Sequence, residues 1–186
     1  MRRHAIGPRL NDDLAQLVRA IPDHPRKGIV FRDISTLLVD GEGFAATIDR
    51  LANEVGEQTF DLVAGIEARG FVIAAALAYR LRLGTLMIRK PGKLPGACIG
   101  IDYELEYGSD RLEMHVDTCA RGSEVLLVDD LLATGGTALA ACELLRRNGA
   151  NVGTAAFVIK LPALGGAGRL AQRGVDVRAL LALEGE

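Results

Sequence analysis

Two adjacent acids and the small residues behind them are the part of this chain best equipped for chemistry. Asp129 and Asp130 follow an apolar stretch, residues 125–128, that predicts a buried parallel strand. Before the helix predicted over residues 137–148 comes a loop that holds Ala133, Thr134, Gly135, Gly136 and Thr137. Its glycines permit a tight turn with inward-facing N–H groups, and the helix adds the positive end of its dipole. The loop therefore predicts a phosphate site.

The two acids restrict which phosphate this loop can take. A carboxylate repels a neighbouring phosphate unless it binds neutral hydroxyl groups or faces a developing positive charge. A ribose 5-phosphate meets both conditions, because its ring offers hydroxyls and can become cationic. A P-loop does not fit, since Thr137 stands where that motif needs lysine, and no G-x-G-x-x-G sequence opens a helix.

A second anion-holding segment lies between another strand and helix. Glu67, Ala68 and Arg69 follow the apolar strand predicted over residues 61–66 and precede the apolar helix predicted over residues 71–83. Backbone N–H groups at a helix start and a guanidinium together suit an anion. A plain surface arginine is the alternative, but cations are disfavoured at that end of a helix.

The third segment is a basic loop, residues 89–100, with three glycines and two prolines. Arg89, Lys90 and Lys93 put three cations within five residues. Such a loop suits a movable clamp for a highly charged leaving group, although charge runs are more often solvated surface. The two other anion sites favour the functional interpretation.

These motifs resemble those of the type I phosphoribosyltransferases. The acids and T-G-G-T resemble the loop of that family that binds phosphoribosyl pyrophosphate (PRPP), and E-A-R-G-F, residues 67–71, resembles the pyrophosphate loop of its adenine-specific members. In that family this loop often contains a cis peptide bond, which here would join Glu67 and Ala68. The resemblance implies transfer of the phosphoribosyl group from PRPP to adenine, giving AMP and pyrophosphate, with Mg²⁺ carried mainly by PRPP and no direct protein metal site.

The resemblance also assigns roles to single residues. Asp129 and Asp130 would hold the ribose hydroxyls and offset the cationic ring, and Glu106, in L-E-Y-G, would be the catalytic carboxylate that holds a proton on the purine. The pyrophosphate would meet Glu67, Ala68, Arg69, Arg89, Lys90 and Lys93. Adenine would lie against Val30, Phe31, Arg32 and Leu161. For Phe31 alone, plain core packing would be an equally good interpretation.

Around these motifs the sequence predicts alternating strands and helices. We expect helices over residues 10–20, 43–58, 71–83 and 137–148 and a short one ending at 173, and strands over residues 61–66, 85–89, 125–128, 151–159 and 175–183. A hairpin is predicted over residues 101–116. The expected fold is α/β: the type I phosphoribosyltransferase fold, with a central, mostly parallel twisted sheet flanked by helices. We expect one domain over residues 1–186, with a small N-terminal hood at 1–34 and a flexible catalytic loop at 89–108 over the site.

Composition narrows the classes of protein. Apolar residues make up 49% and charged residues 25% of the 186 residues, and the net charge is −2, so no basic field would attract nucleic acid or an anionic membrane. The longest apolar run, residues 71–79, is too short to span a bilayer. Three cysteines without metal-like or redox-like spacing, and no apolar segment behind the basic N-terminus, favour a cytoplasmic protein. By family resemblance we expect a homodimer.

Two alternatives remain open from the sequence. The first is a 6-oxopurine or xanthine phosphoribosyltransferase, because such enzymes use a lysine to hold the exocyclic oxygen and Lys160 stands beside Leu161. Neighbours on a strand face opposite ways, so the Lys160 side chain would have to face the base pocket for this role. A PRPP-sensing, nucleic-acid-binding regulator with the same fold is less favoured. The thirty residues before Phe31 are too few for an added winged helix, and the near-neutral charge is unsuitable.

Overall fold

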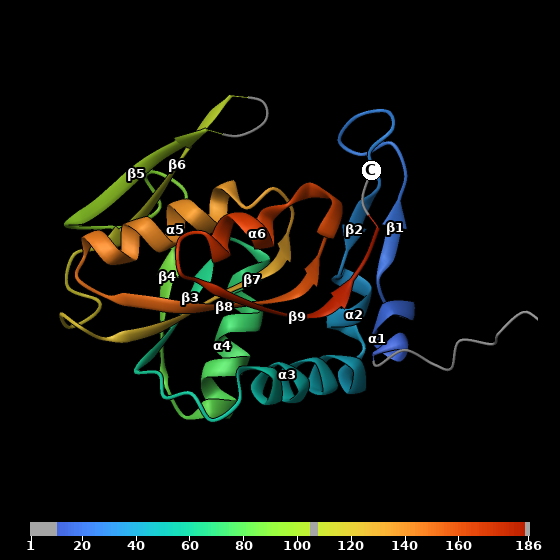
Figure 1. The fold of residues 1–186 in the computed structure, drawn as a ribbon, viewed down its shortest axis with the longest axis horizontal. Coiled ribbons are helices and arrows are strands. Elements are labelled where there is room, and N and C mark those ends of the chain that lie inside the picture. Colours follow the sequence, from blue (N-terminus) through green and yellow to red (C-terminus); the bar gives the residue numbers. More distant parts are fainter. Residues whose placement is uncertain (1–10, 105–107, 185–186) are drawn as a thin grey trace, which may run out of the picture.

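A five-stranded parallel sheet forms the centre of the protein in a computed structural model that describes residues 11–104 and 108–184 (Figure 1). The strands lie in the order β4-β3-β7-β8-β9. Their bounds are Leu62–Ile66 for β3, Gly84–Ile88 for β4, Glu124–Leu132 for β7, Asn151–Lys160 for β8 and Asp176–Ala182 for β9. Buried apolar side chains on both faces explain why β7 and β8 are nearly continuous hydrophobic runs.

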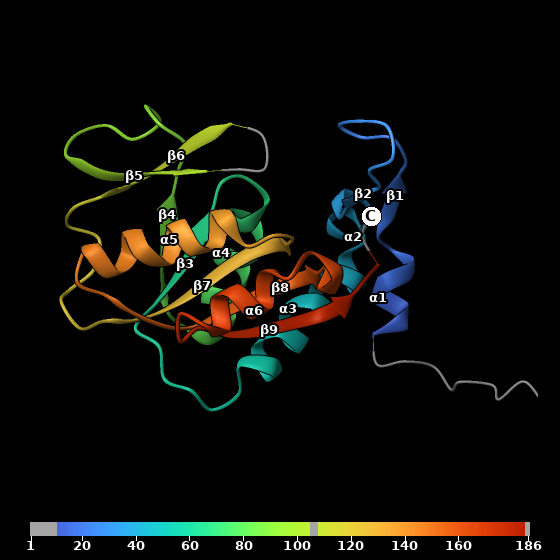
Figure 2. The same cartoon turned by 45° about the horizontal axis from the view of Figure 1, so that its top comes forward.

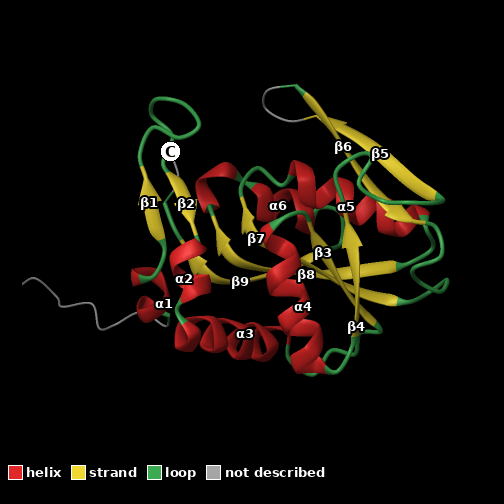
Figure 3. Ribbon diagram, turned by 180° about the vertical axis from the view of Figure 1, so that it is seen from behind, coloured by secondary structure: helices red, strands yellow, loops and turns green. Residues whose placement is uncertain are grey.

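Helices cover both faces of this sheet. On one face lie α3, Gly41–Val55, and α4, Arg69–Leu81; on the other lie α5, Gly136–Arg147, and α6, Gly166–Ala171 (Figure 3). A short 3₁₀ helix, Pro162–Leu164, joins β8 to α6. The core therefore has two halves, one packed around Leu77 and Leu126 on the α4 side and one around Leu127 and Leu144 on the α5 side.

The N-terminal segment builds a small hood beside the end of β9 (Figure 2). It consists of α1, Asp12–Gln16; β1, Arg19–Ile21; β2, Phe31–Asp33; and α2, Ser35–Val39. β1 and β2 pair antiparallel, with Ile21 opposite Phe31. The Arg32 Nη2 atom donates to the carbonyl of Glu184 at 2.7 Å, and Asn11 Nδ2 donates to the carbonyl of Leu180 at 2.9 Å. These bonds join the hood to the far end of the chain.

A separate antiparallel hairpin stands over the opposite flank of the sheet (Figure 2). Its strands are β5, Cys98–Glu104, and β6, Ser109–His115, in a register that pairs Tyr103 with Asp110. Ile99, Ile101 and Tyr103 pack against the core on the α5 side. The hairpin is thus docked on α5, the helix that follows the small-residue loop.

Most of the predicted elements are confirmed, and two predictions are wrong. The helix expected over residues 10–20 includes only Asp12–Gln16 as α1, and Ala20 already belongs to β1. β7 does not end before the acids but runs through Asp129 and Asp130 to Leu132, because Leu131 and Leu132 continue its pairing with β8. The described part of the chain holds no helix long and apolar enough to cross a membrane.

Candidate active site

The acid pair lies at the carboxyl end of the central strand β7. The Asp130 side chain is only 8% exposed, and its backbone N–H donates to Oδ1 of Asp129 at 2.9 Å. Burial raises the pKa of Asp129 well above its usual range, and the negative charge of Asp130 adds to the rise. Gly70 lets α4 approach, since a Cβ there would lie 2.6 Å from Asp129 Oδ1. The two carboxylates are therefore held at a strand end, where ligands of parallel sheets bind.

The small-residue loop forms a cradle directly behind these acids. Gly135 has a φ of +86°, a left-handed conformation that favours glycine, and it precedes the first turn of α5. No described side chain caps this helix, so its first N–H groups are directed to the loop. A cavity of about 100 Å³ is lined by Asp129 and by residues 131–138, including Thr134 and Thr137. Its size and donors suit one phosphate group.

Larger hollows in the described part of the chain lie away from the acids. One of about 490 Å³ is lined by residues at the starts of β7 and β8, including Glu124 and Asn151. The other, of about 380 Å³, lies between β5 and the outer side of α5. Neither is lined by Asp129, Asp130 or Gly135, so chemistry rather than volume identifies the site.

Arg69 connects three predicted parts of the site. Its Nε donates to Asp130 Oδ2 at 2.5 Å, and its guanidinium carbon lies 5.3 Å from the centre of the Phe31 ring. The arginine side chain is 41% exposed, so it can reach a ligand from this position. The predicted sugar, pyrophosphate and base contacts therefore meet at one guanidinium.

Glu67 holds the start of the basic loop. Its carboxylate accepts from the Lys90 N–H at 2.9 Å and from Arg89 Nε at 3.2 Å. The Lys90 N–H, helped by Arg89, lowers the pKa of Glu67, so this carboxylate is charged. The peptide bond between Glu67 and Ala68 is cis, as expected from the family resemblance.

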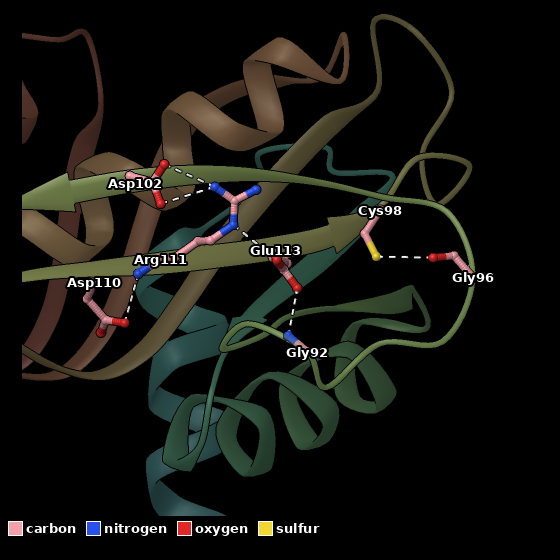
Figure 4. A network of polar contacts seen from close by, with 7 residues as sticks. All are labelled: Gly92, Gly96, Cys98, Asp102, Asp110, Arg111 and Glu113. Carbon is pink, nitrogen blue, oxygen red and sulfur yellow. Dashed lines mark hydrogen bonds and ion pairs between the residues drawn. The ribbon is translucent and has the colours of Figure 1, made fainter.

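The basic loop is also joined to the hairpin (Figure 4). Glu113 Oε2 accepts from the N–H of Gly92 at 3.0 Å, and Glu113 Oε1 accepts from Arg111 Nε at 3.0 Å. The Lys90 ammonium forms an ion pair with Asp110 on β6, while Lys93 is exposed. Arg89, Lys90 and Lys93 thus lie on one connected loop, in which the Lys93 carbonyl accepts from Arg89 Nη1 at 3.2 Å.

Three of the four predicted base contacts lie at the hood. Phe31 and Arg32 are on β2 directly after Val30, and all three are half-buried. His24 meets the Phe31 ring edge-on, with 5.2 Å between ring centres. Leu161 is buried just beyond the end of β8, and its N–H donates to the carbonyl of Leu132 at 2.9 Å.

Glu106 lies outside the described residues, so its role stays a prediction. In residues 11–104 and 108–184, no group of three or more His, Cys, Asp or Glu side chains could hold a metal ion by itself. The oxygen donors of Asp129 and Asp130 fit a Mg²⁺ that is bound mainly by substrate phosphates and water.

Sequence reasoning missed three residues that shape this site. Tyr103 and Asp110 contact Lys90, and the residue pattern alone did not fix the hairpin register that pairs them. Gly166, at the start of α6, packs against the cradle so closely that a Cβ there would overlap the Ala133 carbonyl oxygen. The glycine-rich run before α6 was too unspecific to indicate this contact.

The parallel sheet, the paired aspartates and the glycine cradle together define a type I phosphoribosyltransferase. The sequence profile of the phosphoribosyl transferase domain matches residues 35–180. The adenine phosphoribosyltransferase of Novosphingobium aromaticivorans is 56% identical over 174 residues, which are 94% of this chain and 98% of that protein.

Solved structures agree with this relationship. The adenine phosphoribosyltransferase of Thermoanaerobacter pseudethanolicus superposes with a TM-score of 0.88 at 44% identity, covering 92% of this chain and 98% of that one. The Saccharomyces cerevisiae enzyme, solved with adenine and an imino-altritol bisphosphate, has a TM-score of 0.84 at 37% identity, covering 91% and 97%. This chain belongs to the adenine phosphoribosyltransferase family.

Proposed function

We propose that this enzyme transfers the 5-phosphoribosyl group of PRPP to adenine, giving AMP and pyrophosphate in purine salvage. The observation that carries the proposal is that Asp129 lines the same cavity as residues 131–138, with Asp130 beside it on β7. A phosphate in that cavity puts a ribose ring beside the two carboxylates. The relatives' names point to adenine as the acceptor, and they do not favour a 6-oxopurine or xanthine.

The 5-phosphate is the anchor of the substrate. The uncapped N–H groups at the start of α5 and the hydroxyls of Thr134 and Thr137 supply its donors. Fixing this end of PRPP removes rotational freedom before reaction, and such positioning supplies several kcal/mol of the barrier.

The ribose ring is stabilised as it becomes cationic. The bond from C1 to pyrophosphate stretches first, and positive charge develops on the ring while the pyrophosphate takes the bonding electrons. Asp129 and Asp130 hold the two ring hydroxyls, and their charge offsets that of the ring. The purine nitrogen then forms the new bond to C1.

The leaving pyrophosphate meets the cations that now pair with protein carboxylates. Arg69 pairs with Asp130, Arg89 with Glu67 and Lys90 with Asp110. These carboxylates hold the cations in place before the substrate binds. Pyrophosphate oxygens then bind the same cations, either beside the carboxylates or in their place. Glu67 acts by positioning Arg89 and the Lys90 N–H, and Lys93 reaches the ligand from the exposed loop.

Adenine stacks on Phe31 with backbone groups of Val30 and Arg32 at its edge, and Leu161 covers its other face. The Arg32 Nη2 atom donates to the Glu184 carbonyl at 2.7 Å, which holds the Arg32 side chain in place. Glu106 holds a proton on the ring nitrogen opposite the one that reacts. A Glu106→Gln variant should slow turnover with little change in PRPP affinity; collapse of PRPP affinity would place Glu106 elsewhere.

A divalent cation and a second subunit complete the proposal. Mg²⁺ would be carried by PRPP with oxygens of Asp129 and Asp130 near it, and it would neutralise charge on the leaving group. Val72 and Tyr79 on α4 and Met87 on the edge strand β4 are exposed apolar side chains on neighbouring elements. Such a face supports a homodimer, and the enzyme would act in the cytoplasm.

The test is a substrate panel. The purified protein is incubated with PRPP, Mg²⁺ and one base at a time: adenine, hypoxanthine, guanine or xanthine. Formation of AMP alone is the expected result. A nucleotide from hypoxanthine, guanine or xanthine at a comparable rate would contradict the proposed acceptor, and no nucleotide from any base would contradict the proposed reaction.

A further inference from the structure

The phenol of Tyr103 touches side chains from both predicted anion sites. Lys90 Nζ, on the basic loop, lies 3.4 Å from the Tyr103 hydroxyl oxygen. Thr137 Oγ1, in the phosphate cradle, lies 3.4 Å from the same oxygen. Asp110 Oδ2, on the other hairpin strand, lies 3.1 Å away. One hydroxyl thus contacts three segments that are far apart in the sequence.

These three contacts use the full bonding capacity of a phenol. A phenolic oxygen donates one hydrogen bond and accepts two. The carboxylate of Asp110 can only accept, so Tyr103 donates to it and accepts from Lys90 and Thr137. The two accepted bonds are longer than the usual length of about 2.8 Å and are therefore weak. A phosphate oxygen could replace the Tyr103 oxygen as the acceptor for Lys90 or Thr137 at a small cost in free energy.

The Tyr103 hydroxyl is held in place from both sides. Its strand partner in the hairpin register is Asp110, and its ring packs against the core on the α5 side. The Lys90 ammonium lies 5.9 Å from the centre of the same ring. Burial alone would lower the pKa of Lys90, but the bonds that its ammonium donates to Asp110 and Tyr103 outweigh this effect and raise that pKa. Lys90 is therefore charged, and Asp110 and Tyr103 hold its ammonium against the hairpin.

We propose that Tyr103 is a positioning residue that couples the 5-phosphate site to the pyrophosphate site. This inference rests on the proposed function, because PRPP is the ligand that carries both anionic groups. With Lys90 and Thr137 held by one hydroxyl, the donors for the two ends of PRPP are set at a fixed separation before binding. A ligand that spans both sites then loses less freedom than two separate ligands.

Coupling of this kind distinguishes a double-ended ligand from its halves. Ribose 5-phosphate uses the cradle, and pyrophosphate uses the basic loop. If Tyr103 sets the distance between them, its hydroxyl matters most for PRPP. The hydroxyl also makes bound ribose 5-phosphate and bound pyrophosphate affect each other's affinity, and the effect is equal in both directions.

Tyr103→Phe tests this, because it removes the hydroxyl and keeps the ring. We expect KM and Kd for PRPP to rise about five- to tenfold, the size of the net contribution of one hydrogen bond. The dissociation constants of ribose 5-phosphate and pyrophosphate, measured singly by calorimetry, should change less than about twofold, and KM for adenine should stay the same. Thr118→Val also removes one hydroxyl, which donates to the His115 carbonyl in the turn after β6, and it should leave PRPP binding unchanged.

Three outcomes decide between the possibilities. Unchanged PRPP affinity in Tyr103→Phe overturns the inference. Equal losses for PRPP, ribose 5-phosphate and pyrophosphate also overturn it, because they indicate general damage to the fold. Failure of the wild-type protein to bind PRPP at all contradicts the proposed function instead, so the two failures are distinct.

A double-mutant cycle checks the route through the cradle. Thr137→Val removes the hydroxyl that donates to Tyr103. If the two hydroxyls act as a unit, Tyr103→Phe should weaken PRPP binding much less in the Thr137→Val background than in the wild type. Full additivity of the two effects would contradict the coupling, even where each single variant binds PRPP weakly.

Discussion

Arg69 and Asp130 form an ion pair between the start of α4 and the end of β7, with 2.5 Å between Nε and Oδ2. The carboxylate is nearly buried and the guanidinium is partly exposed. In the proposed reaction the first group holds a ribose hydroxyl and the second meets pyrophosphate. The pair therefore keeps each group in position, and neutralises the buried charge, until PRPP supplies new partners for both.

The planar guanidinium of Arg69 gives the first prediction. Arg69→Lys keeps the charge but loses the fork that can bond Asp130 while lying over Phe31. We expect KM for PRPP to rise about tenfold or more, since a hydrogen bond between charged groups contributes about 1.5–3 kcal/mol. Steady-state kinetics with varied PRPP provide the measurement.

Arg80→Lys is the matched control for Arg69→Lys. Arg80 also bonds an aspartate through Nε, at 2.7 Å from Asp49, but both side chains are exposed on α3 and α4. Its KM values should equal those of the wild type. A PRPP KM for Arg69→Lys within twofold of the wild type would show that the planar fork has no role.

The aspartate pair gives the second prediction. Asp129→Asn together with Asp130→Asn should lower kcat at least about a hundredfold, because the developing ring charge loses both carboxylates. The fold should survive, since asparagine keeps the shape and carries no charge, and it is burial, with repulsion from Asp130 second, that disfavours a charge at Asp129 and raises its pKa. Turnover is measured with AMP formation and folding with circular dichroism. Near-normal turnover would refute the role of the pair at the sugar.

The parts of the site that could be predicted are local in sequence. Asp129, Asp130 and the cradle lie within nine residues, so one strand-to-helix segment carries their chemistry. The bond from Arg69 to Asp130 spans 61 positions, and no sequence periodicity indicates which carboxylate the arginine meets. Contacts of this kind depend on how α4 packs on β7.

The missed fold elements have a similar physical explanation. β1 and β2 are three residues each, too short for an alternating pattern, and they are stabilised by each other and by the bonded Asp33. The extension of β7 was hidden because two acids interrupt an apolar run. The strand can hold these acids because Asp130 pairs with Arg69 and Asp129 lines the cavity of the site.

Asp33 gives the third prediction, on stability against pH. Its nearly buried carboxylate accepts from Ser35 Oγ at 2.6 Å and Arg19 Nε at 3.1 Å. The Ser35 hydroxyl, followed by Arg19, lowers the pKa of Asp33 far below its ordinary value of 3.8. The charged carboxylate therefore stabilises the folded state at pH values above 3.8. This contribution is lost as the pH falls below 3.8 toward the lower pKa of the folded state. Asp33→Asn should cost about 1–2 kcal/mol at neutral pH.

The measurement for Asp33 is the free energy of unfolding in urea from pH 7 down to pH 2.5. In Asp33→Asn, the free energy of unfolding should fall less steeply at the acidic end than in the wild type. Asp49→Asn, in the exposed pair with Arg80, should cost well under about 1 kcal/mol. Parallel wild-type and Asp33→Asn curves would show that Asp33 does not supply the acid sensitivity.

Gly166 gives the fourth prediction, because α6 supports the cradle from outside it. A Cβ at Gly166 would overlap the Ala133 carbonyl oxygen and lie 3.0 Å from the Gly135 nitrogen, and both are backbone atoms that cannot rotate away. Gly166→Ala should therefore displace the cradle or α6. We expect a loss of about 1–3 kcal/mol in stability and a rise of about tenfold in KM for PRPP.

Gly168→Ala is the matched control, since Gly168 lies on the same short helix and a methyl group added there would meet no described atom within 4 Å outside its own stretch of helix. Alanine at this position should leave KM for PRPP unchanged and add up to about 1 kcal/mol of stability, because glycine is the poorer helix former. The comparison separates the effect of an added methyl group on α6 from its effect on the cradle. Equal PRPP affinities in the two variants would mean that the cradle tolerates movement of α6, and that the phosphate is held by α5 alone.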